Sequence, residues 1–508
     1  MAAVSRLLHI PHSAFRTEEV PWPADAEALF ARLARRRGCV WLDSAGGPAN
    51  LARWSVLAAE PSAVLVHQGG VSRFVAPDGR AVLEPHENPF DALRAAVRAA
   101  RFAGGHTHHA RSEMPGEDPP FGPGFYGYLA YDLGPYVEPT APLSPTRDIA
   151  LPDLWFGYYE TVLVLDHAER RAVLIGADGP PAAGHGTACG RAREALGSAL
   201  AEADGPADWL DAAQPAREAS CNFTRAAYLA AVARAREYIA AGDIFQVNLS
   251  RRFTVPLEPC APGPDPRPAS LYRHLRHANP APYAAYIGLG AGRAVLSSSP
   301  ELFLDLAAGR VVTRPIKGTR PRRAGEAESS DFNRRERDNL LRSEKDKAEL
   351  VMITDLERND IGRVCDYGSV RVTNPRAVEA YETVYHTVAT VEGRLHAEAD
   401  VVDLLRATFP GGSITGAPKV RAMQIIAELE PTRRSVYTGA VGYLAPPSDA
   451  EPAGRCSLNI AIRTLLVAGQ AVHLQAGGGI VADSDPAAEF DETSDKARAM
   501  LAALGLAP

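Results

Sequence analysis

The segment YAAYIGLGAGRAVLSSSPELFLDLAAGRVVTRPIKGT, residues 283–319, decides the fold that we predict for this chain. Residues 283–289 and 293–297 are apolar runs separated by a short Gly-containing turn, a pattern typical of two paired β-strands. Two more strand-like runs follow at 302–306 and 310–316. Strands joined by such short turns pair in an antiparallel sense, because a parallel crossover needs a much longer connection.

The rest of the chain repeats this succession of strands and adds groups of helices. Further strands are predicted at 39–42, 54–57, 63–66, 155–165, 171–176, 244–255, 437–444, 456–467 and 471–476. Helices are predicted at 90–101 and 188–203, after the caps Thr224 and Ser343 (the latter to about Leu356), near Pro418, and from Asp485-Pro486 to Leu504. Runs of strands without strict βαβ alternation predict an α+β fold with largely antiparallel sheets.

Length and composition bound the organisation and the class of protein. A chain of 508 residues exceeds one simple core, and an Ala, Gly, Asp and Pro-rich stretch suggests three parts: a subdomain over 1–180, a linker over 181–220 and a domain over 221–508. The net charge of −7 argues against nucleic-acid binding. No apolar run could span a membrane and no secretory signal is visible. The six cysteines lack metal or CxxC spacing, so we expect a cytoplasmic protein with reduced thiols.

Lys317 and Glu301 are the strongest candidates for chemistry. Lys317 lies between Pro315-Ile316 and Gly318-Thr319, and Glu301 follows Ser299-Pro300. A neutral lysine can attack an electrophilic carbon and hold the product covalently. A glutamic acid nearby can protonate a departing hydroxyl group. The alternative is a solvated turn lysine with a glutamate as its surface partner.

Three glutamates on two predicted helices suggest a metal site. Glu349 lies beside an apolar run, whereas Glu489 and Glu492 are three residues apart on the last helix, with Lys496 one turn further. Carboxylates from two helices suit Mg²⁺, which keeps several waters and is often completed by substrate oxygens. The alternative is a pair of solvated helix faces.

Polar and Gly-rich segments surround these glutamates. Residues 410–419 lead into a helix N-terminus, and residues 476–480 would allow close backbone approach to a carboxylate. Arg463, at a strand end, could bind a carboxylate in a bidentate manner. His386 is either a hydrogen-bond donor or a packed core histidine; taken alone, it favours the core.

Together these segments resemble the chorismate-utilising enzymes, the first components of anthranilate synthase and aminodeoxychorismate synthase. The resemblance rests on motifs that occur in one order: residues 242–250, 298–301, 315–319, 348–349, 358–360, 416–419 and 479–496. It implies two stacked, mostly antiparallel sheets flanked by helices, with chorismate and Mg²⁺ in a cleft. It places magnesium on Glu349 and Glu492 with Glu489 close by. It places substrate contacts on Gly318, Thr319, His386, Ser413, Tyr443, Arg463, Gly477, Gly478, Gly479 and Lys496.

Two positions distinguish the branches of this family. Water-adding relatives have a lysine where this chain has Gln246, and anthranilate synthases have an alanine where it has Lys317. The resemblance therefore favours aminodeoxychorismate formation through a covalent Lys317 intermediate, with Glu301 as the acid. It also implies ammonia from a glutaminase on a separate chain, and a product for p-aminobenzoate and folate or for a secondary metabolite.

Residues near the N-terminus resemble the tryptophan pocket of the same family. They are Ser44, Arg53, Trp54, Pro282 and Tyr283. An ordinary sandwich core without a ligand explains these residues equally well. Two alternatives to the activity also stay open: anthranilate synthase component I, and a non-catalytic regulatory protein that binds chorismate or tryptophan.

Overall fold

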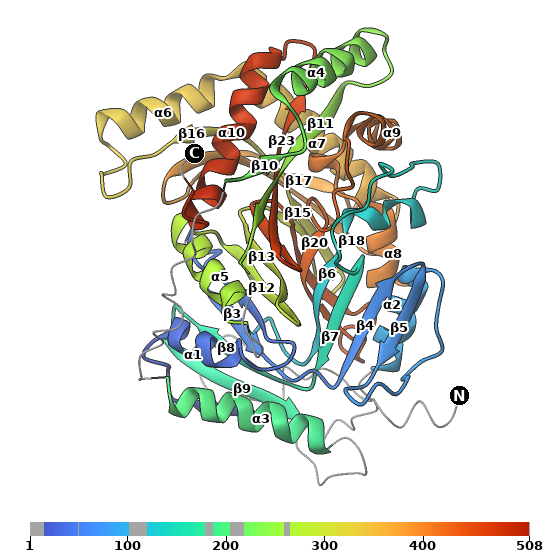
Figure 1. Cartoon of the computed structure of the whole chain (residues 1–508), viewed down its shortest axis with the longest axis vertical. Coiled ribbons are helices and arrows are strands. Elements are labelled where there is room, and N and C mark those ends of the chain that lie inside the picture. Colours follow the sequence, from blue (N-terminus) through green and yellow to red (C-terminus); the bar gives the residue numbers. More distant parts are fainter. Residues whose placement is uncertain are drawn as a thin grey trace.

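The computed structural model of the chain describes residues 15–48, 50–100, 119–177, 186–203, 218–258 and 265–506. All of its named strands belong to two large sheets, which occupy the centre of the molecule, with helices at the periphery (Figure 1). Every ladder between the named strands is antiparallel, and the 283–299 segment forms the predicted pair, with Tyr283 opposite Ser299. The predicted α+β fold with stacked antiparallel sheets is therefore confirmed.

The first sheet contains twelve strands in the order β1-β9-β8-β3-β2-β12-β13-β22-β23-β11-β10, with β19 also paired to β11. In that order the strands span Phe15–Val20, Arg171–Ala177, Thr161–Asp166, Trp54–Ala58, Val40–Asp43, Tyr283–Gly290, Arg293–Ser299, Thr464–Ala468, Ala471–Ile480, Gln246–Pro256 and Ser220–Cys221, and β19 is Gly416–Ala417.

The second sheet contains eleven strands in the order β16-β18-β15-β14-β21-β20-β6-β7-β4-β5, with β17 also paired to β18. In that order they span Ile316–Pro321, Val384–Arg394, Arg310–Arg314, Leu302–Ala307, Arg455–Ile460, Ala440–Ala445, Gly124–Leu129, Leu154–Tyr159, Ala63–Gln68 and Val71–Val75, and β17 is Arg371–Ala380. Both sheets take strands from before and after the predicted linker, so the two predicted domains share their cores.

Ten α-helices cover the sheets in the described residues. They are α1 (Ala26–Leu33), α2 (Pro89–Ala99), α3 (Gly186–Ala201), α4 (Arg225–Ala240), α5 (Arg267–Ala278), α6 (Asp331–Arg342), α7 (Glu344–Gly362), α8 (Val401–Thr408), α9 (Lys419–Leu429) and α10 (Pro486–Ala503). Two 3₁₀ turns, η2 (Tyr131–Tyr136) and η4 (Gly412–Ile414), lie between them. Helix α3 lies within the predicted linker, of which residues 181–185 and 204–217 are outside the described residues.

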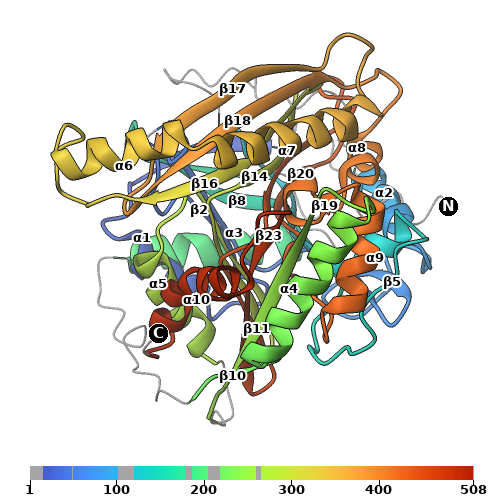
Figure 2. The ribbon, with the colours of Figure 1, turned by 90° about the horizontal axis from the view of Figure 1, so that it is seen from above.

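The buried apolar side chains form layers that follow from this arrangement. Val56, Val295 and Val441 belong to the cluster between the two sheets. A second cluster packs α1, α3, α5 and α10 onto the first sheet, and a third packs α2 and α8 onto the second. Burial of a large apolar side chain contributes about 1.5–3 kcal/mol, so these layers supply the main stabilisation. Helices α6 and α7 lie along β16, β17 and β18 (Figure 2).

Several element boundaries test the sequence predictions directly. The Thr224 hydroxyl caps α4 and the Ser343 hydroxyl caps α7 through the Asp346 N–H, as predicted. Helix α7 continues six residues past the predicted end at Leu356, because Asp360 and Ile361 bury against the core. The strand predicted over 456–467 is wrong as a single element, because Arg463 adopts φ +51° and separates β21 from β22.

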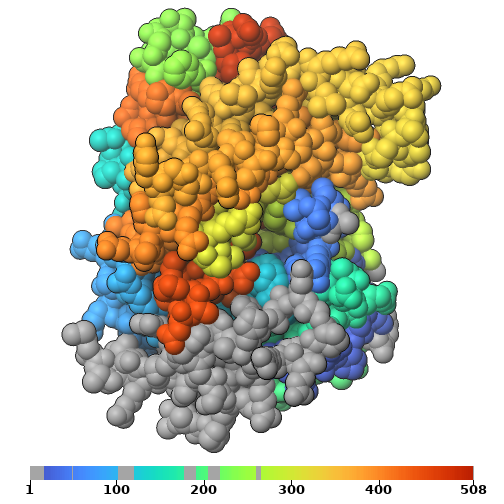
Figure 3. Space-filling view, turned by 180° about the vertical axis from the view of Figure 1, so that it is seen from behind, coloured from blue at the N-terminus to red at the C-terminus, as the bar shows by residue number. Residues whose placement is uncertain are grey.

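On the face opposite Figure 1, a continuous yellow-to-orange surface covers the upper half of the molecule (Figure 3). Residues of α6 and β17 fall in that colour range.

None of the helices in the described residues is long and apolar enough to cross a membrane.

Candidate active site

A bulge in β16 lies at Lys317, next to α7 and η4, in the region where the resemblance places the substrate cleft. Lys317 pairs with Thr387 of β18, and the register shifts before Thr319, which pairs with His386. Gly318 lies between them with φ +73°, and a side chain there would come within 2.8 Å of Leu340. Glycine is needed at this position for both reasons, and bulges of this kind redirect a neighbouring side chain.

The Lys317 amine is held among carboxylates in a poorly solvated place. Its Nζ donates a hydrogen bond to the Ser413 carbonyl at 3.3 Å. Burial lowers the Lys317 pKa, and the opposing attraction of Glu349 and Glu301 does not cancel this effect. A lowered pKa increases the fraction of free amine, which is the nucleophilic form.

Glu301 lies on the turn between β13 and β14 and is only 5% exposed. The Ser299 hydroxyl accepts the Glu301 N–H at 3.2 Å, and the Ile460 N–H donates to the Glu301 carbonyl at 3.1 Å, which fixes this turn. Burial raises the Glu301 pKa, while the Ser413 hydroxyl and Lys317 lower it by less. Both shifts favour the uncharged forms of Glu301 and Lys317, the forms in which a carboxyl group can donate a proton and an amine can act as a nucleophile.

Glu357 is a buried acid of this region that the sequence analysis missed. It lies two turns after Glu349 on α7, and its carboxylate accepts a hydrogen bond from the Thr313 hydroxyl at 2.7 Å. Burial raises its pKa well above the ordinary value, and the nearby Glu301 raises it further. The helical spacing from Leu350 and Ile353 is the signal that could have placed Glu357 on the buried face.

The predicted metal-binding glutamates come from two helices that face the Lys317 amine. Burial raises the Glu349 pKa, which Lys317 opposes and Glu492 reinforces. Burial also acts to raise the Glu492 pKa, but Lys496, at 2.7 Å, makes the net shift a lowering. Glu489 is buried and accepts a hydrogen bond from the Ser484 hydroxyl at 2.7 Å.

These carboxylates fit a magnesium ion by their donor chemistry. Within the described part of the chain, no group of three or more His, Cys, Asp or Glu side chains is close enough to hold a metal by itself. Mg²⁺, however, commonly takes only one or two protein carboxylates and completes its shell with water and substrate oxygens. Glu349 and Glu492 could be those two, because they interact electrostatically across the cleft.

The glycines of β23 lie against α10 on one side and β11 on the other. Gly478 faces α10: a side chain there would lie 2.9 Å from the Glu489 carboxylate. Gly479 faces the other way, where a side chain would collide with the buried Gln246 carboxamide. The Gly477 carbonyl accepts a hydrogen bond from Lys496 at 2.9 Å. The absence of side chains therefore lets the strand lie directly against both carboxylate and amide groups.

His386 is a neutral hydrogen-bonding group of the candidate site, and Arg463 is a cationic one. Burial lowers the His386 pKa to about 4, with Arg463 adding to the effect, so the imidazole is neutral near pH 7. Its Nδ1 lies 3.1 Å from the Thr319 hydroxyl and 3.3 Å from the Gly318 carbonyl. No carboxylate of the described residues forms an ion pair with Arg463, which leaves its charge for an anionic ligand.

Tyr443 is the one predicted substrate contact that the structure places elsewhere. Its ring packs against Tyr126, with centroids 4.8 Å apart, and its hydroxyl donates to the Pro123 carbonyl at 3.4 Å. It therefore belongs to the core between the sheets, and its assignment to the cleft is corrected. Tyr437, which the sequence analysis missed, is instead the tyrosine that interacts electrostatically with Arg463. Both lie in the same Tyr-rich segment, which left the choice open to error.

A separate cavity of about 200 Å³ lies between the sheets near β2 and β12. Ser44, Trp54, Pro282 and Tyr283 line it, as predicted for the tryptophan pocket. Arg53 does not line it, because its guanidinium pairs with Asp166 at 2.9 Å and stacks on the Trp54 ring.

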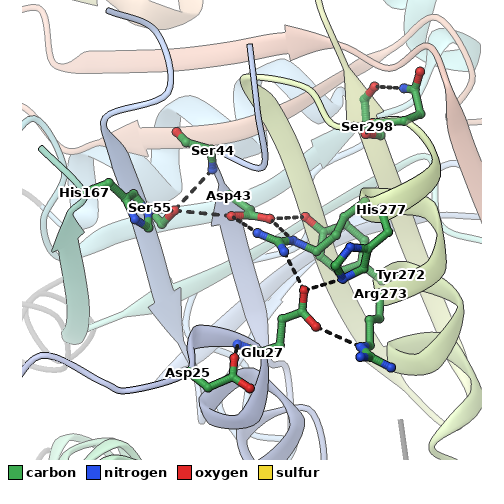
Figure 4. Close-up of polar contacts among 12 residues, drawn as sticks. Asp25, Glu27, Asp43, Ser44, Ser55, His167, Tyr272, Arg273, His277 and Ser298 are labelled. Carbon is green, nitrogen blue, oxygen red and sulfur yellow. Dashed lines mark hydrogen bonds and ion pairs between the residues drawn. The ribbon is translucent and has the colours of Figure 1, made fainter. Parts of the chain in front are cut away.

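A charged network borders this cavity (Figure 4). Asp43, at the cavity wall, accepts from Arg276 of α5 at 2.8 Å, and Arg276 also pairs with Glu27 of α1 at 2.6 Å. On the other side, the Ser55 hydroxyl is hydrogen-bonded to the His167 Nε2 at 2.8 Å. The network connects α5 and α1 to Asp43 at the end of β2.

Known proteins share both this sequence and this fold. The family model described as chorismate binding enzyme matches residues 38–502. Anthranilate synthase component 1 from Streptomyces coelicolor is 44% identical over 86% of this chain and 81% of the relative. Aminodeoxychorismate synthase component 1 from Klebsiella aerogenes is 38% identical over 95% of this chain and 97% of the relative. The crystal structure of anthranilate synthase component I from Streptococcus pneumoniae superposes with a TM-score of 0.70 at 31% identity, covering 88% of this chain and 92% of that one.

Proposed function

The chain belongs to the chorismate binding enzyme family, and we propose that it is an aminodeoxychorismate synthase component I that makes 4-amino-4-deoxychorismate from chorismate and ammonia. The family and its relatives make the chain a chorismate-utilising enzyme of the aminodeoxychorismate synthase or anthranilate synthase component I type. The choice between these two activities depends on the chemistry of Lys317.

One observation carries the choice between the two activities. Lys317 stands where the resemblance gives alanine in anthranilate synthases, and its amine has a lowered pKa beside Glu301. A nucleophilic amine next to an acid is unnecessary if ammonia alone attacks chorismate. Anthranilate synthase component I is the second candidate, because the Streptomyces coelicolor relative of that name has the higher identity, 44% against 38%.

The residues of the cleft can carry the reaction in two steps. The Lys317 amine attacks C2 of chorismate, and the C4 hydroxyl leaves as water with the proton of Glu301. Ammonia then attacks C4 and expels the neutral Lys317 amine from C2. The ammonium group so formed returns one proton to the Glu301 carboxylate, which restores the acid. The enolpyruvyl group is retained throughout.

Other residues of the cleft bind and orient the substrate in this proposal. Arg463 faces a carboxylate of chorismate, and neutral His386 with Thr319 offers hydrogen bonds. Gly318, Ser413, the β23 glycines and Lys496 line the remaining wall. Glu349 and Glu492, with Glu489 close by, would hold Mg²⁺, which when bound supplies charge stabilisation at the ring carboxylate.

Two partners belong to the proposal as well. The ammonia would come from a glutaminase on a separate chain, as the word "component" in the names of the relatives suggests. Tryptophan is a candidate ligand for the cavity lined by Ser44, Trp54, Pro282 and Tyr283, because an aromatic ring and polar groups line the same space.

Product analysis with the purified chain tests the proposal. The chain is incubated with chorismate, Mg²⁺ and an ammonium salt at mildly alkaline pH, and the products are identified by mass spectrometry. We expect 4-amino-4-deoxychorismate from the wild type and a mass adduct on the intact protein. Lys317→Ala should lose both. EDTA should abolish turnover and excess Mg²⁺ should restore it, because the carboxylates alone leave the substrate charge unbalanced.

Lys345→Ala is the matched control, because Lys345 is an exposed lysine beside the cleft, 4.0 Å from Glu349. It should keep the wild-type product. Anthranilate and pyruvate from the wild type would overturn the proposal in favour of the second candidate. Turnover that is unaffected by EDTA would overturn the magnesium assignment alone.

A further inference from the structure

Helix α5 ends at a residue that contacts the candidate carboxylate anchor, Arg463. Asn279 is the C-cap of α5, and its N–H donates to the Leu275 carbonyl at 2.9 Å. Its side-chain Oδ1 accepts a hydrogen bond from the Arg463 guanidinium at 3.1 Å. Its Nδ2 donates to the Ser298 carbonyl at 3.0 Å. Both halves of the carboxamide are thus used, and one of them binds Arg463.

Ser298 joins Asn279 and Arg463 into a closed ring of hydrogen bonds. The Ser298 hydroxyl donates to the Asn279 carbonyl, and the Ser298 N–H donates to the Arg463 carbonyl at 3.1 Å. Ser298 is buried on β13, beside α5 (Figure 4). The backbone and the side chain of Arg463 are therefore both tied to the same two residues.

This ring of hydrogen bonds, and not an ion pair with a carboxylate, fixes the orientation of the partly buried Arg463. Such arginines are commonly fixed by a carboxylate in a bidentate ion pair. Arg463 has no such partner in the described ranges, and its φ of +51° is uncommon for a residue with a side chain. Asn279 supplies the side-chain hydrogen bond that fixes the guanidinium.

We propose that Asn279 is a positioning residue, which holds the Arg463 guanidinium in the orientation that receives a carboxylate of the substrate. A neutral carboxamide suits this role, because it accepts one N–H and leaves the full positive charge and the other donors for the ligand. An aspartate in its place would pair with Arg463 and neutralise it. The inference rests on the proposed function only in that the ligand of Arg463 is chorismate.

The test measures chorismate affinity apart from the chemical step. The KM for chorismate, kcat, and the Kd from calorimetry are compared for wild type, Asn279→Ala and Asn279→Asp. We expect Asn279→Ala to raise KM and Kd about tenfold, the usual worth of one hydrogen bond to a charged group. The kcat should change much less, because binding of ground state and transition state is weakened together. Asn279→Asp should bind more weakly still.

Two controls separate positioning from a structural role. Asn222→Ala removes a similar carboxamide, which bridges Thr432 and the Arg252 N–H, and should lower the melting temperature without raising KM. In an Arg463→Lys background, Asn279→Ala should have little further effect, because the group that it positions is gone.

The outcomes are distinguishable. An unchanged KM in Asn279→Ala, or effects of the two substitutions that simply multiply, would overturn the inference and leave the proposed function standing. Anthranilate as the wild-type product would overturn the proposed function, while the affinities would still decide the role of Asn279. A wild type that binds no chorismate would overturn both.

Discussion

At the scale of single residues, the cleft works by placing ionisable groups where water cannot solvate them well. Burial lowers the pKa of Lys317 and raises that of Glu301, so both shifts favour the uncharged forms. Separately, each would be an ordinary buried group. Together they provide the nucleophile and the proton donor that the proposed reaction requires.

Glu301→Gln tests this pairing, because glutamine keeps the shape and removes the proton. We expect kcat to fall by about 10²–10⁴, the usual contribution of a general acid, with little change in chorismate affinity. Wild-type activity should also fall as pH rises through the raised Glu301 pKa, because the acid is then ionised. The substitution should remove this alkaline limb. Glu344→Gln, at an exposed glutamate at the start of α7, is the control, and equal kcat values in both variants would contradict the role of Glu301.

At the scale of elements, one buried ion pair holds together the segments that form the cleft. Arg434 donates to Glu430 at 2.7 Å, to the Ile414 carbonyl of η4 at 3.0 Å and to the Asn248 carbonyl of β11 at 2.8 Å. Ile414 follows Ser413, whose carbonyl accepts the Lys317 hydrogen bond. The position of η4 therefore depends on Arg434.

Arg434→Met should destabilise the protein severely. Both charges of the pair are 1% exposed, and removal of one partner leaves Glu430 buried and unpaired. Breaking such a pair typically costs about 3–5 kcal/mol of unfolding free energy, measurable from urea unfolding. Arg498→Met, which breaks an exposed pair with Asp495, should cost at most about 1 kcal/mol. A loss below that of the exposed control would contradict this account.

At the scale of the whole molecule, the sheets bury histidines that must stay neutral. Burial lowers the pKa of His67, His386 and His473 to about 4 each. In the unfolded chain a histidine titrates near 6.5, so the unfolded state binds more protons between these values. Stability is therefore fully present above about pH 6.5 and is lost as pH falls toward about 4.

His473→Gln should make the protein less sensitive to acid. His473 lies on β23, where its Nδ1 is 3.0 Å from the Thr254 hydroxyl of the neighbouring strand β11. Between pH 7 and pH 5 the titration of His473 lowers the unfolding free energy of the wild type by about 2 kcal/mol. The unfolding free energy of the variant should therefore fall by about 2 kcal/mol less over the same pH interval. Urea unfolding at both pH values measures it. An unchanged pH dependence of the unfolding free energy in His473→Gln would refute the linkage.

The local elements and the chemical inventory could be predicted from the sequence by itself. Apolar runs separated by a short Gly-containing turn gave the strand pair at 283–299, and capping side chains such as Thr224 and Ser343 gave helix starts, because these signals act over a few residues. The residues themselves indicated Lys317, Glu301, Glu349 and Glu492 as candidates, and the resemblance added their proposed roles and the substrate contacts. Ends set by packing, such as that of α7 at Gly362, were misplaced.

What only the tertiary structure decided is which side chains meet. It separated Tyr443 from the cleft and brought Tyr437 to Arg463, although the two tyrosines are six residues apart. It also placed Glu357 beside Glu301, and Asn279 against Arg463 across 184 residues of sequence. Burial and charge pairing arise from strands and helices distant in the chain, so the lowered pKa of Lys317 exists only in the folded protein.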